Sequence, residues 1–277
     1  MYVLPEKIDR AIDNSLCEAS GMMMKRRIPW MCCLGFGEVP APYFTRNKYE
    51  YSVIQAPPGD PRDLSRMGNP TWKGVEALEL TLIGQEEITL ASLCCHNLRP
   101  MSIHFQTPSS GVDSFFTVRH STCGDGLCYP LQPLELFSND KINDAPRLVG
   151  RIRDDHCDHI WERLNCMYIT DIETRSSHKK FKRAYSIRVN KGCSGGTVQN
   201  FCAPSCFRGD AVYDILNARG KVVAHLQERF NPECISVSPF STYLLAFPDG
   251  SGVDERALLV AALLSIEMRT PSGRTVC

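Results

Sequence analysis

The stretch "YLLAFPDGSGVDERALLVAALLSIEM", residues 243–268, contains the longest apolar run of the chain and decides what kind of fold is possible. The ten residues 257–266 carry no charge, with Arg256 before them and Glu267 after them. A helix of that length covers about 15 Å, roughly half of a hydrocarbon core that is about 30 Å thick. A helix that is apolar on all sides but too short to span a bilayer is typical of a protein interior. We therefore expect a core helix here and not a membrane anchor.

The same stretch predicts where this helix begins and ends. Residues 253–268 are rich in strong helix formers and contain neither Gly nor Pro, and Pro271 prevents any continuation. Ser251 followed by Asp254 resembles a capping box, and the negative charges of Asp254 and Glu255 suit the first turn of a helix. The residues that we expect to be buried by strands are Leu258, Leu259, Ala262 and Ile266.

Upstream of the helix the sequence has a β texture. From about residue 49, short runs of alternating apolar and polar residues are separated by Gly, Pro, Asn and Ser. Two hairpins are predicted, one turning at Gly84-Gln85 and one turning at residues 217–220. Many short strands and one C-terminal helix predict a single mainly-β domain, either a barrel or a sandwich.

The composition excludes several classes of protein. Charged residues make up 22% of the 277 residues and apolar residues 43%, which is too apolar for a disordered chain. The 31 basic and 31 acidic residues cancel, which argues against a dedicated nucleic-acid binder. The start of the chain has no apolar segment behind a basic one, so we expect no secretory signal. The fourteen cysteines are then cytosolic thiols, available for metal binding, S-acylation or burial, and not disulfides.

Several stretches, taken in order, resemble the phospholipid scramblase family, whose fold is similar to the tubby C-terminal domain. These stretches are NKYEY (47–51), IGQEEITLASLCCHNLRPMSIHF (83–105), RHSTCGDGLCYPLQPLELF (119–137), RLVGRI (147–152), CAPSCF (202–207), VYDILNARGKVVAHLQ (212–227) and AFPDGSGVDERALLVAALLSIEM (246–268). The resemblance implies a closed antiparallel β-barrel of about twelve strands around a buried C-terminal helix. It divides the chain into an N-terminal segment with a short helix (1–46), a barrel domain (47–270) with its helix at 253–268, and a tail (271–277).

The resemblance also implies a function. Members of the family promote bidirectional, energy-independent movement of phospholipids between membrane leaflets, which involves no bond-making chemistry and no catalytic residue. Expected partners are membrane phospholipids and other copies of the chain. The expected location is the cytosolic face of the plasma membrane, or the cytoplasm or nucleus when the chain is not acylated. The alternative is a tubby-like regulatory module that binds lipids or proteins without transporting lipid.

Four cysteines are candidates for S-acylation, that is, for palmitoylation. Cys123 and Cys128 stand where the resemblance implies the multi-cysteine acylation site of the family, and two acyl chains give stable anchoring where one does not. Cys32 and Cys33 lie beside Trp30 and the basic run "KRR", a combination that suits a membrane surface.

A calcium site is the next implied feature. The family has an acidic loop before the Phe-Pro turn, but this chain has Pro239 and Ser241 in that loop. The carboxylates that remain for a weak calcium site are those of Asp249, Asp254 and Glu255. Calcium takes six to eight oxygen ligands, which this loop cannot supply alone. The alternative is that Asp249 belongs to a turn and that Asp254 and Glu255 are the acidic residues at the start of the helix.

Two further groups of residues have competing interpretations. The basic run "HKKFKRAYSIR" (178–188) suits acidic lipid head groups or nuclear import, or it is a solvated loop tip. The cations concerned are Lys179, Lys180, Lys182 and Arg183. Cys202 and Cys206, together with Cys94, Cys95 and His96, are candidate zinc ligands, with buried or acylated thiols as the alternative. Apart from the adjacent Cys95 and His96, no arrangement typical of a catalytic site is found.

Overall fold

The computed structural model of the chain is mainly β. It describes residues 16, 19–27, 30–33, 37–40, 48–54, 79–87, 101–108, 113–119, 133–142, 145–154, 169–176, 180–189, 211–230 and 241–269. Twelve strands form a closed barrel: β1 (Gly21–Arg27), β4 (Lys48–Ile54), β5 (Leu80–Glu87), β6 (Met101–Gln106), β7 (Asp113–Arg119), β8 (Leu134–Ile142), β9 (Ala145–Asp154), β10 (Ile169–Arg175), β11 (Phe181–Val189), β12 (Ala211–Asn217), β13 (Val222–Phe230) and β14 (Ser241–Ala246). A separate two-stranded sheet is formed by β2 (Trp30–Cys33) and β3 (Gly37–Pro40), and the helix is α5 (Val253–Arg269).

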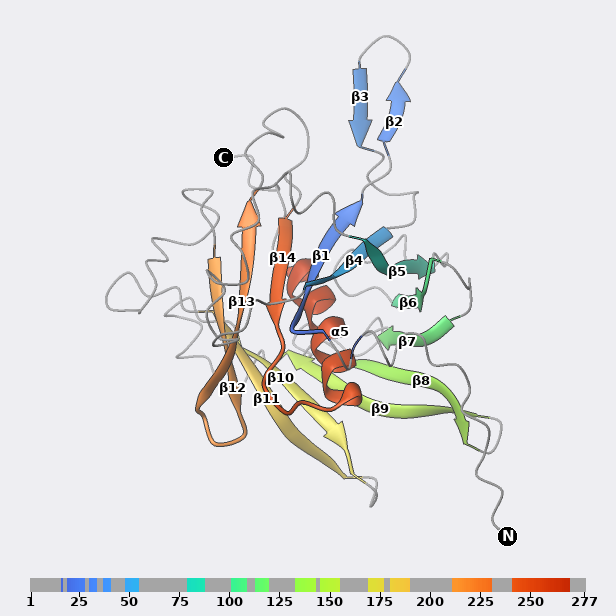
Figure 1. Cartoon of the computed structure of the whole chain (residues 1–277). Helices are drawn as coiled ribbons and strands as arrows, with labels where there is room; N and C mark the ends of the chain where they lie inside the picture. The colour runs from blue at the N-terminus through green and yellow to red at the C-terminus, as the bar shows by residue number, and fades with distance from the viewer. Residues whose placement is uncertain are drawn as a thin grey trace, which may run out of the picture.

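Neighbouring strands of the barrel pair antiparallel, and from β4 to β14 they follow the order of the chain (Figure 1). The barrel is closed by β1, which lies between β14 and β4. Met24 of β1 opposes Tyr243 of β14 on one side and Tyr51 of β4 on the other. The predicted fold class, a closed barrel of about twelve strands around a C-terminal helix, is therefore confirmed.

The barrel begins earlier in the chain than the sequence predicted. The expected boundary at residue 47 left Gly21–Arg27 in the N-terminal segment, whereas this stretch is the strand β1. Its apolar residues do not alternate with polar ones, because Met22, Met23 and Met24 follow one another and all three are buried. A strand that is covered on both faces lacks the period-two signal on which the prediction depended.

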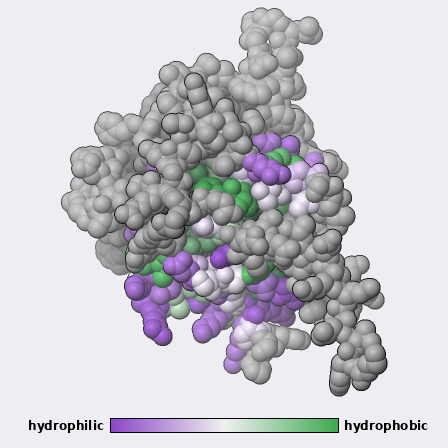
Figure 2. Space-filling model, viewed as in Figure 1, coloured by the Kyte–Doolittle hydropathy of each residue, from purple (hydrophilic) through white to green (hydrophobic). Residues whose placement is uncertain are grey.

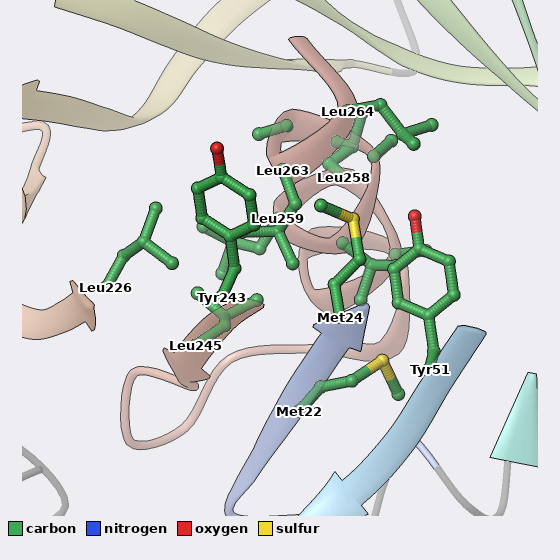
Figure 3. Close-up of a cluster of buried hydrophobic side chains, with 14 of the residues drawn as sticks. Met22, Met24, Tyr51, Leu226, Tyr243, Leu245, Leu258, Leu259, Leu263 and Leu264 are labelled. Carbon is green, nitrogen blue, oxygen red and sulfur yellow. The ribbon is translucent and has the colours of Figure 1, made fainter. Parts of the chain in front are cut away.

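The helix α5 runs through the inside of the barrel. Every residue from 257 to 267 is buried, and those from 258 to 265 are completely inaccessible to solvent. Figure 3 shows the side chains of Met24, Tyr51 and Tyr243 around the leucines of α5. The predicted burial of Leu258, Leu259, Ala262 and Ile266 is confirmed. The apolar run is therefore the core of the barrel and is surrounded by the strands.

One strand comes so close to the helix that only glycine fits. A Cβ atom on Gly150 of β9 would lie 2.8 Å from Leu258 Cδ1 of α5 and would also meet the carbonyl oxygen of Glu173 on β10. Contacts this short do not occur between carbon atoms in folded proteins. Gly150 therefore sets the distance between α5 and this side of the barrel.

The two predicted hairpin turns have opposite outcomes. The turn at 217–220 is confirmed, because Gly220 N donates to Asn217 O at 2.9 Å and Gly220 has a φ of 77°. The turn at Gly84-Gln85 is wrong, because β5 continues through both residues. A Cβ on Gly84 would lie 3.4 Å from atoms of Tyr49, Tyr51 and Phe105. Gly84 therefore packs against these aromatic residues in the middle of a strand and does not form a turn.

Candidate functional site

The start of α5 carries the first candidate site, the carboxylates that the sequence named for calcium. Asp254 accepts two hydrogen bonds from the Arg147 guanidinium, both at 2.9 Å. Glu255 accepts one from the Tyr185 hydroxyl at 3.0 Å and one from the backbone N–H of Gly252 at 3.3 Å. Both carboxylates are therefore engaged with partners in the protein, in the first turn where the helix dipole favours negative charge.

This arrangement corrects the predicted capping box. The carboxylate that returns to the N-cap backbone belongs to Glu255, and the N-cap residue is Gly252. The hydroxyl of Ser251 donates to Pro248 O at 2.6 Å and accepts from Arg256 Nε at 3.0 Å. Ser251 thus closes the turn before the helix and does not cap its N–H groups.

Arg256 ties the start of the helix to the segment before β1. Its guanidinium donates to the carbonyl oxygen of Leu16 and, at 3.0 Å, to that of Ala19, and it lies 5.2 Å from the centre of the Phe247 ring. Leu16 and Ala19 are buried. A charged donor that satisfies buried carbonyl groups stabilises the junction between the two ends of the chain.

Because of these contacts, few carboxylate oxygens at the helix start are left to bind a cation. Asp249 is exposed and belongs to the turn before the helix, while Asp254 and Glu255 have the partners described above. Among the described residues, no three His, Cys, Asp or Glu side chains are grouped so that they could hold a metal ion. Burial, followed by the charge of Glu255 and its hydrogen bond, raises the pKa of Tyr185 well above its usual range. Calcium binding by Asp249, Asp254 and Glu255 stays a prediction.

Acidic side chains inside the barrel were missed by sequence reasoning. Glu86, Glu228 and Glu267 are each at most 5% exposed. Glu228 accepts hydrogen bonds from the hydroxyls of Tyr213, at 2.6 Å, and Tyr243, at 3.3 Å. Strand alternation was the available signal, since Glu86 follows Leu82 and Gly84, and Glu228 follows Ala224 and Leu226, at steps of two residues.

Tyr51 lies in the same interior. Burial raises the pKa of its hydroxyl well above the usual range, and the neighbouring Tyr49 and the charge of Glu267 act in the same direction. Within the part of the chain that the structure describes, the hydroxyl of Tyr51 has no hydrogen-bond partner. The interior is thus polar near the end of α5, in contrast to the apolar middle of the helix.

The predicted basic run lies on a hairpin between β10 and β11. Lys180 precedes β11 and is exposed, as are Lys182 and Arg183 on the strand itself, so these two cations are not on a loop tip. Lys179 lies outside the described residues. The neighbouring side chains of Arg175, Arg219 and Lys221 are also exposed. We call the barrel end that carries these cations, which is also the end where α5 begins, the basic end.

The two cysteines whose strand the structure describes belong to the opposite end of the barrel. Cys32 and Cys33 lie on β2, opposite Glu38 and Gly37 of β3, in a hairpin that stands beyond this end (Figure 1). Cys123 and Cys128, Cys202 and Cys206, and Cys94, Cys95 and His96 lie outside the described residues. The strands before and after each of these groups have their nearest ends at this same end of the barrel.

The positions of all fourteen cysteines in the sequence show the same asymmetry. Twelve of the fourteen cysteines occur in the six stretches of sequence between strands that meet at this opposite end. The stretches between strands that meet at the basic end contain none. Antiparallel strands place alternate connections at alternate ends, so all the cysteine-containing stretches join strands at one end. We call this end the cysteine end.

Comparisons of the chain with protein-family models, with curated proteins and with solved structures found no match. Within the described ranges, no helix has both the length and the apolar character needed to cross a bilayer.

Proposed function

We propose that the chain is a scramblase-like protein that acts at the cytosolic face of membranes and promotes energy-independent movement of phospholipids between leaflets. The observation that carries this proposal is the closed twelve-stranded barrel around a buried C-terminal helix. It is the fold that the sequence resemblance to phospholipid scramblases implies, and the Phe-Pro turn and helix of that resemblance correspond to residues 247–269 of the structure.

The distribution of cysteines supports attachment to a membrane. The acylation candidates Cys32, Cys33, Cys123 and Cys128 all occur in stretches of sequence between strands that meet at the cysteine end. Acyl chains that leave the barrel from one end can enter one bilayer together, and two of them give anchoring that a single chain does not. Palmitoylation of these residues is therefore part of the proposal.

A second candidate function is favoured by the position of α5. The most apolar segment of the chain is enclosed by strands, so it offers no apolar face along which a lipid head group could pass through a core about 30 Å thick. The second candidate is a regulatory module of the tubby type that binds lipids or proteins at the membrane and has no transport activity.

Reconstitution separates the two candidates. Purified protein is placed in liposomes that carry a fluorescently labelled phospholipid, and the fraction of label in the outer leaflet is followed with and without calcium. Loss of lipid asymmetry in the presence of folded protein supports transport. The Leu259→Asp variant serves as a control for leakage caused by unfolded protein. Retention of asymmetry under both conditions contradicts transport and leaves the binding module.

The calcium question has its own matched variant. Asp249→Asn combined with Asp254→Asn removes two of the three carboxylates named for calcium at unchanged side-chain size, and circular dichroism checks that the fold survives the loss of the Asp254–Arg147 ion pair. If these residues bind calcium, the calcium-dependent part of lipid movement disappears in this variant. If it is unchanged, calcium acts elsewhere or not at all.

Acylation is tested by labelling that hydroxylamine removes. We expect the label to fall in Cys123→Ser/Cys128→Ser and in Cys32→Ser/Cys33→Ser, and to persist in Cys202→Ser/Cys206→Ser. Equal labelling of all three double variants would contradict the assignment. Elemental analysis of the purified protein for zinc tests whether Cys202 and Cys206 bind metal instead.

A further inference from the structure

Two neighbouring hairpins carry a concentration of positive charge in a chain whose net charge is zero. The cations are Arg175, Lys180, Lys182 and Arg183 on the β10–β11 hairpin and Arg219 and Lys221 on the β12–β13 hairpin. All six are exposed, and none makes an ion pair with another described residue. Because β11 pairs with β12 as far as Tyr185 and Asn217, the two hairpins lie side by side at the basic end.

The backbone beneath these cations is fixed. The side-chain oxygen of Asn217 accepts hydrogen bonds from the backbone N–H groups of Arg219, at 3.0 Å, and Lys221, at 3.1 Å. On the other hairpin, Ser176 N donates to Lys180 O at 2.8 Å. Such turns fix the backbone that carries the cations, so a ligand that binds several of them does not also have to order the backbone.

The β10–β11 hairpin is also held against the barrel. The guanidinium of Arg151 lies 4.0 Å from the centre of the Phe181 ring and forms an ion pair with Glu173 at 2.5 Å. The aromatic ring is therefore covered by a cation that already has its own carboxylate. Lys182 and Arg183, one and two residues beyond Phe181, are left for an external anion.

The acidic residue described opposite these cations is Glu173, the register partner of Arg183, and it already forms an ion pair with Arg151. The exposed acids described at the basic end are Glu79, before β5, and Asp249 and Asp254 around the helix start. Asp254 is already paired with Arg147. Figure 2 shows hydrophilic side chains protruding along the lower edge of the molecule, where these hairpins turn. Within the described ranges, the six cations of the hairpins therefore have no ion-pair partner.

We propose that these six cations form a docking surface for an anionic lipid bilayer. Protruding hairpin tips present their charges to a flat surface, which a bilayer provides, and each Lys or Arg close to an anionic bilayer contributes about a factor of five in affinity. Among the described residues of the two hairpin tips, the aromatic ring is that of Phe181, and Arg151 lies over it, which disfavours stacking of nucleic-acid bases there. The proposal deepens the proposed function and rests on its membrane assignment, but not on lipid transport.

The position of the surface separates charge from acylation. A strand of nine residues is about 30 Å long, and electrostatic attraction is screened within about 8 Å at physiological ionic strength. When the basic end contacts a bilayer, the cysteine end faces away from it. Charge and acyl chains are therefore two separate attachments of the protein.

Binding of recombinant protein made in bacteria, which carries no acyl chains, tests the docking surface. Co-sedimentation is measured with vesicles of phosphatidylcholine alone and of phosphatidylcholine mixed with phosphatidylserine, at low and high salt. We expect binding only to the anionic vesicles and its loss at high salt. The triple variant Lys182→Gln/Arg183→Gln/Arg219→Gln is expected to lower the partition coefficient roughly 100-fold.

The matched control removes three charges at the cysteine end, in Arg26→Gln/Arg27→Gln/Lys48→Gln. Arg27 and Lys48 are register partners there, and this variant is expected to bind anionic vesicles like the unchanged protein. A larger loss in the control than in the first triple variant would overturn the proposal. So would equal binding to neutral vesicles, no binding to either, or binding to duplex DNA that needs the same three cations while anionic vesicles are not bound.

The liposome transport assay distinguishes a failure here from a failure of the proposed function. If the first triple variant binds vesicles normally while the unchanged protein still moves lipid, the docking surface is wrong and the function stands. If vesicle binding depends on the three cations and no lipid moves, the surface is right and the transport function is wrong.

Discussion

The first turn of α5 and the rest of the helix are stabilised in different ways. In the first turn, Asp254, Glu255 and Arg256 each have a polar partner outside the helix, and these contacts are directional. From residue 257 onward the side chains are buried and mainly apolar, and the strands pack against them from all sides. Polar contacts therefore fix where the helix begins, whereas packing supplies most of the stability of the barrel.

The largest effect is expected in the packed part of the helix. Leu259→Asp places an unpaired charge where the side chain has no solvent exposure, so we expect unfolding, with a loss of more than about 4 kcal/mol. Circular dichroism and thermal denaturation measure it. Leu259→Met keeps the volume and is expected to cost less than about 1.5 kcal/mol. If Leu259→Asp stays folded but leaves the membrane, the helix is an anchor and its place in the core is wrong.

The next effect concerns the contact between the helix and β9. Gly150→Ala introduces a Cβ into space already occupied by Leu258 and the backbone of β10, and we expect a loss of about 3 kcal/mol in a denaturant titration. In a Leu258→Ala background one of the two clashes is absent. Gly150→Ala should therefore cost less stability in that background than in the unchanged protein. Strict additivity of the two changes would show that Gly150 and Leu258 do not contact each other.

A smaller loss is expected at the start of the helix. Arg256→Ala leaves the carbonyl oxygens of Leu16 and Ala19 without this donor, and we expect a loss of about 2 kcal/mol together with faster proteolysis of the segment before β1. Arg256→Lys keeps the charge but lacks the planar pair of donors. Its stability should lie between that of the unchanged protein and that of Arg256→Ala. Proteolysis at an unchanged rate in Arg256→Ala would contradict the tie between helix and N-terminal segment.

A smaller effect still is expected at neutral pH for Tyr185→Phe, and it changes with pH. The pKa of Tyr185 is raised in the folded protein, first by burial and then by Glu255. Its contribution is therefore fully present below the unfolded value of about 10, and it is lost as the pH rises above that value, because the unfolded chain ionises first. Tyr185→Phe should make the decline of stability above pH 10 shallower, as measured by denaturant titrations along a pH series.

Tyr51→Phe is the matched comparison at the other end of the helix. The hydroxyl of Tyr51 is buried and has no hydrogen-bond partner in the described structure, so its removal should not destabilise the protein at neutral pH. Its pKa is also raised, and the same flattening above pH 10 is expected. An unchanged alkaline decline in both variants would show that neither tyrosine keeps its proton in the folded state.

Features encoded by neighbouring residues could be predicted from the sequence. The apolar run, its flanking charges and Pro271 gave helix limits within one residue of those observed, and the residues expected to be buried are buried. The turn at 217–220 has an Asn and a Gly in the positions that such a turn requires.

Features that depend on distant parts of the chain could not be predicted in this way. The role of β1 depends on pairing with strands from both ends of the chain, and the Met run gives no alternation to indicate it. Gly84 fits beside aromatic rings that belong to other strands, although a glycine within an alternating sequence usually suggests a turn. Closure of the barrel was implied by the resemblance and not by the residues themselves.

The candidate sites divide in a similar way. Lys180, Lys182 and Arg183 were found from a local run of cations, but Arg219 and Lys221 join them only because β11 pairs with β12. The partners of Asp254 and Glu255 come from β9 and β11, far from the helix in sequence. A list of acidic residues near the helix start therefore could not reveal that they were already engaged.

The position of β1 between β14 and β4 has a consequence for the synthesis of the protein. A strand near the start of the chain and the last strand must both be present before the barrel can close, and the helix that fills it follows the last strand. Contacts between residues so far apart in sequence form slowly. A nascent chain therefore keeps its apolar strand faces uncovered until residues 241–269 have left the ribosome, a period in which chaperones can bind. Ribosome-bound chains that end before residue 253 should accordingly be cleaved by protease throughout the barrel, whereas the released chain resists.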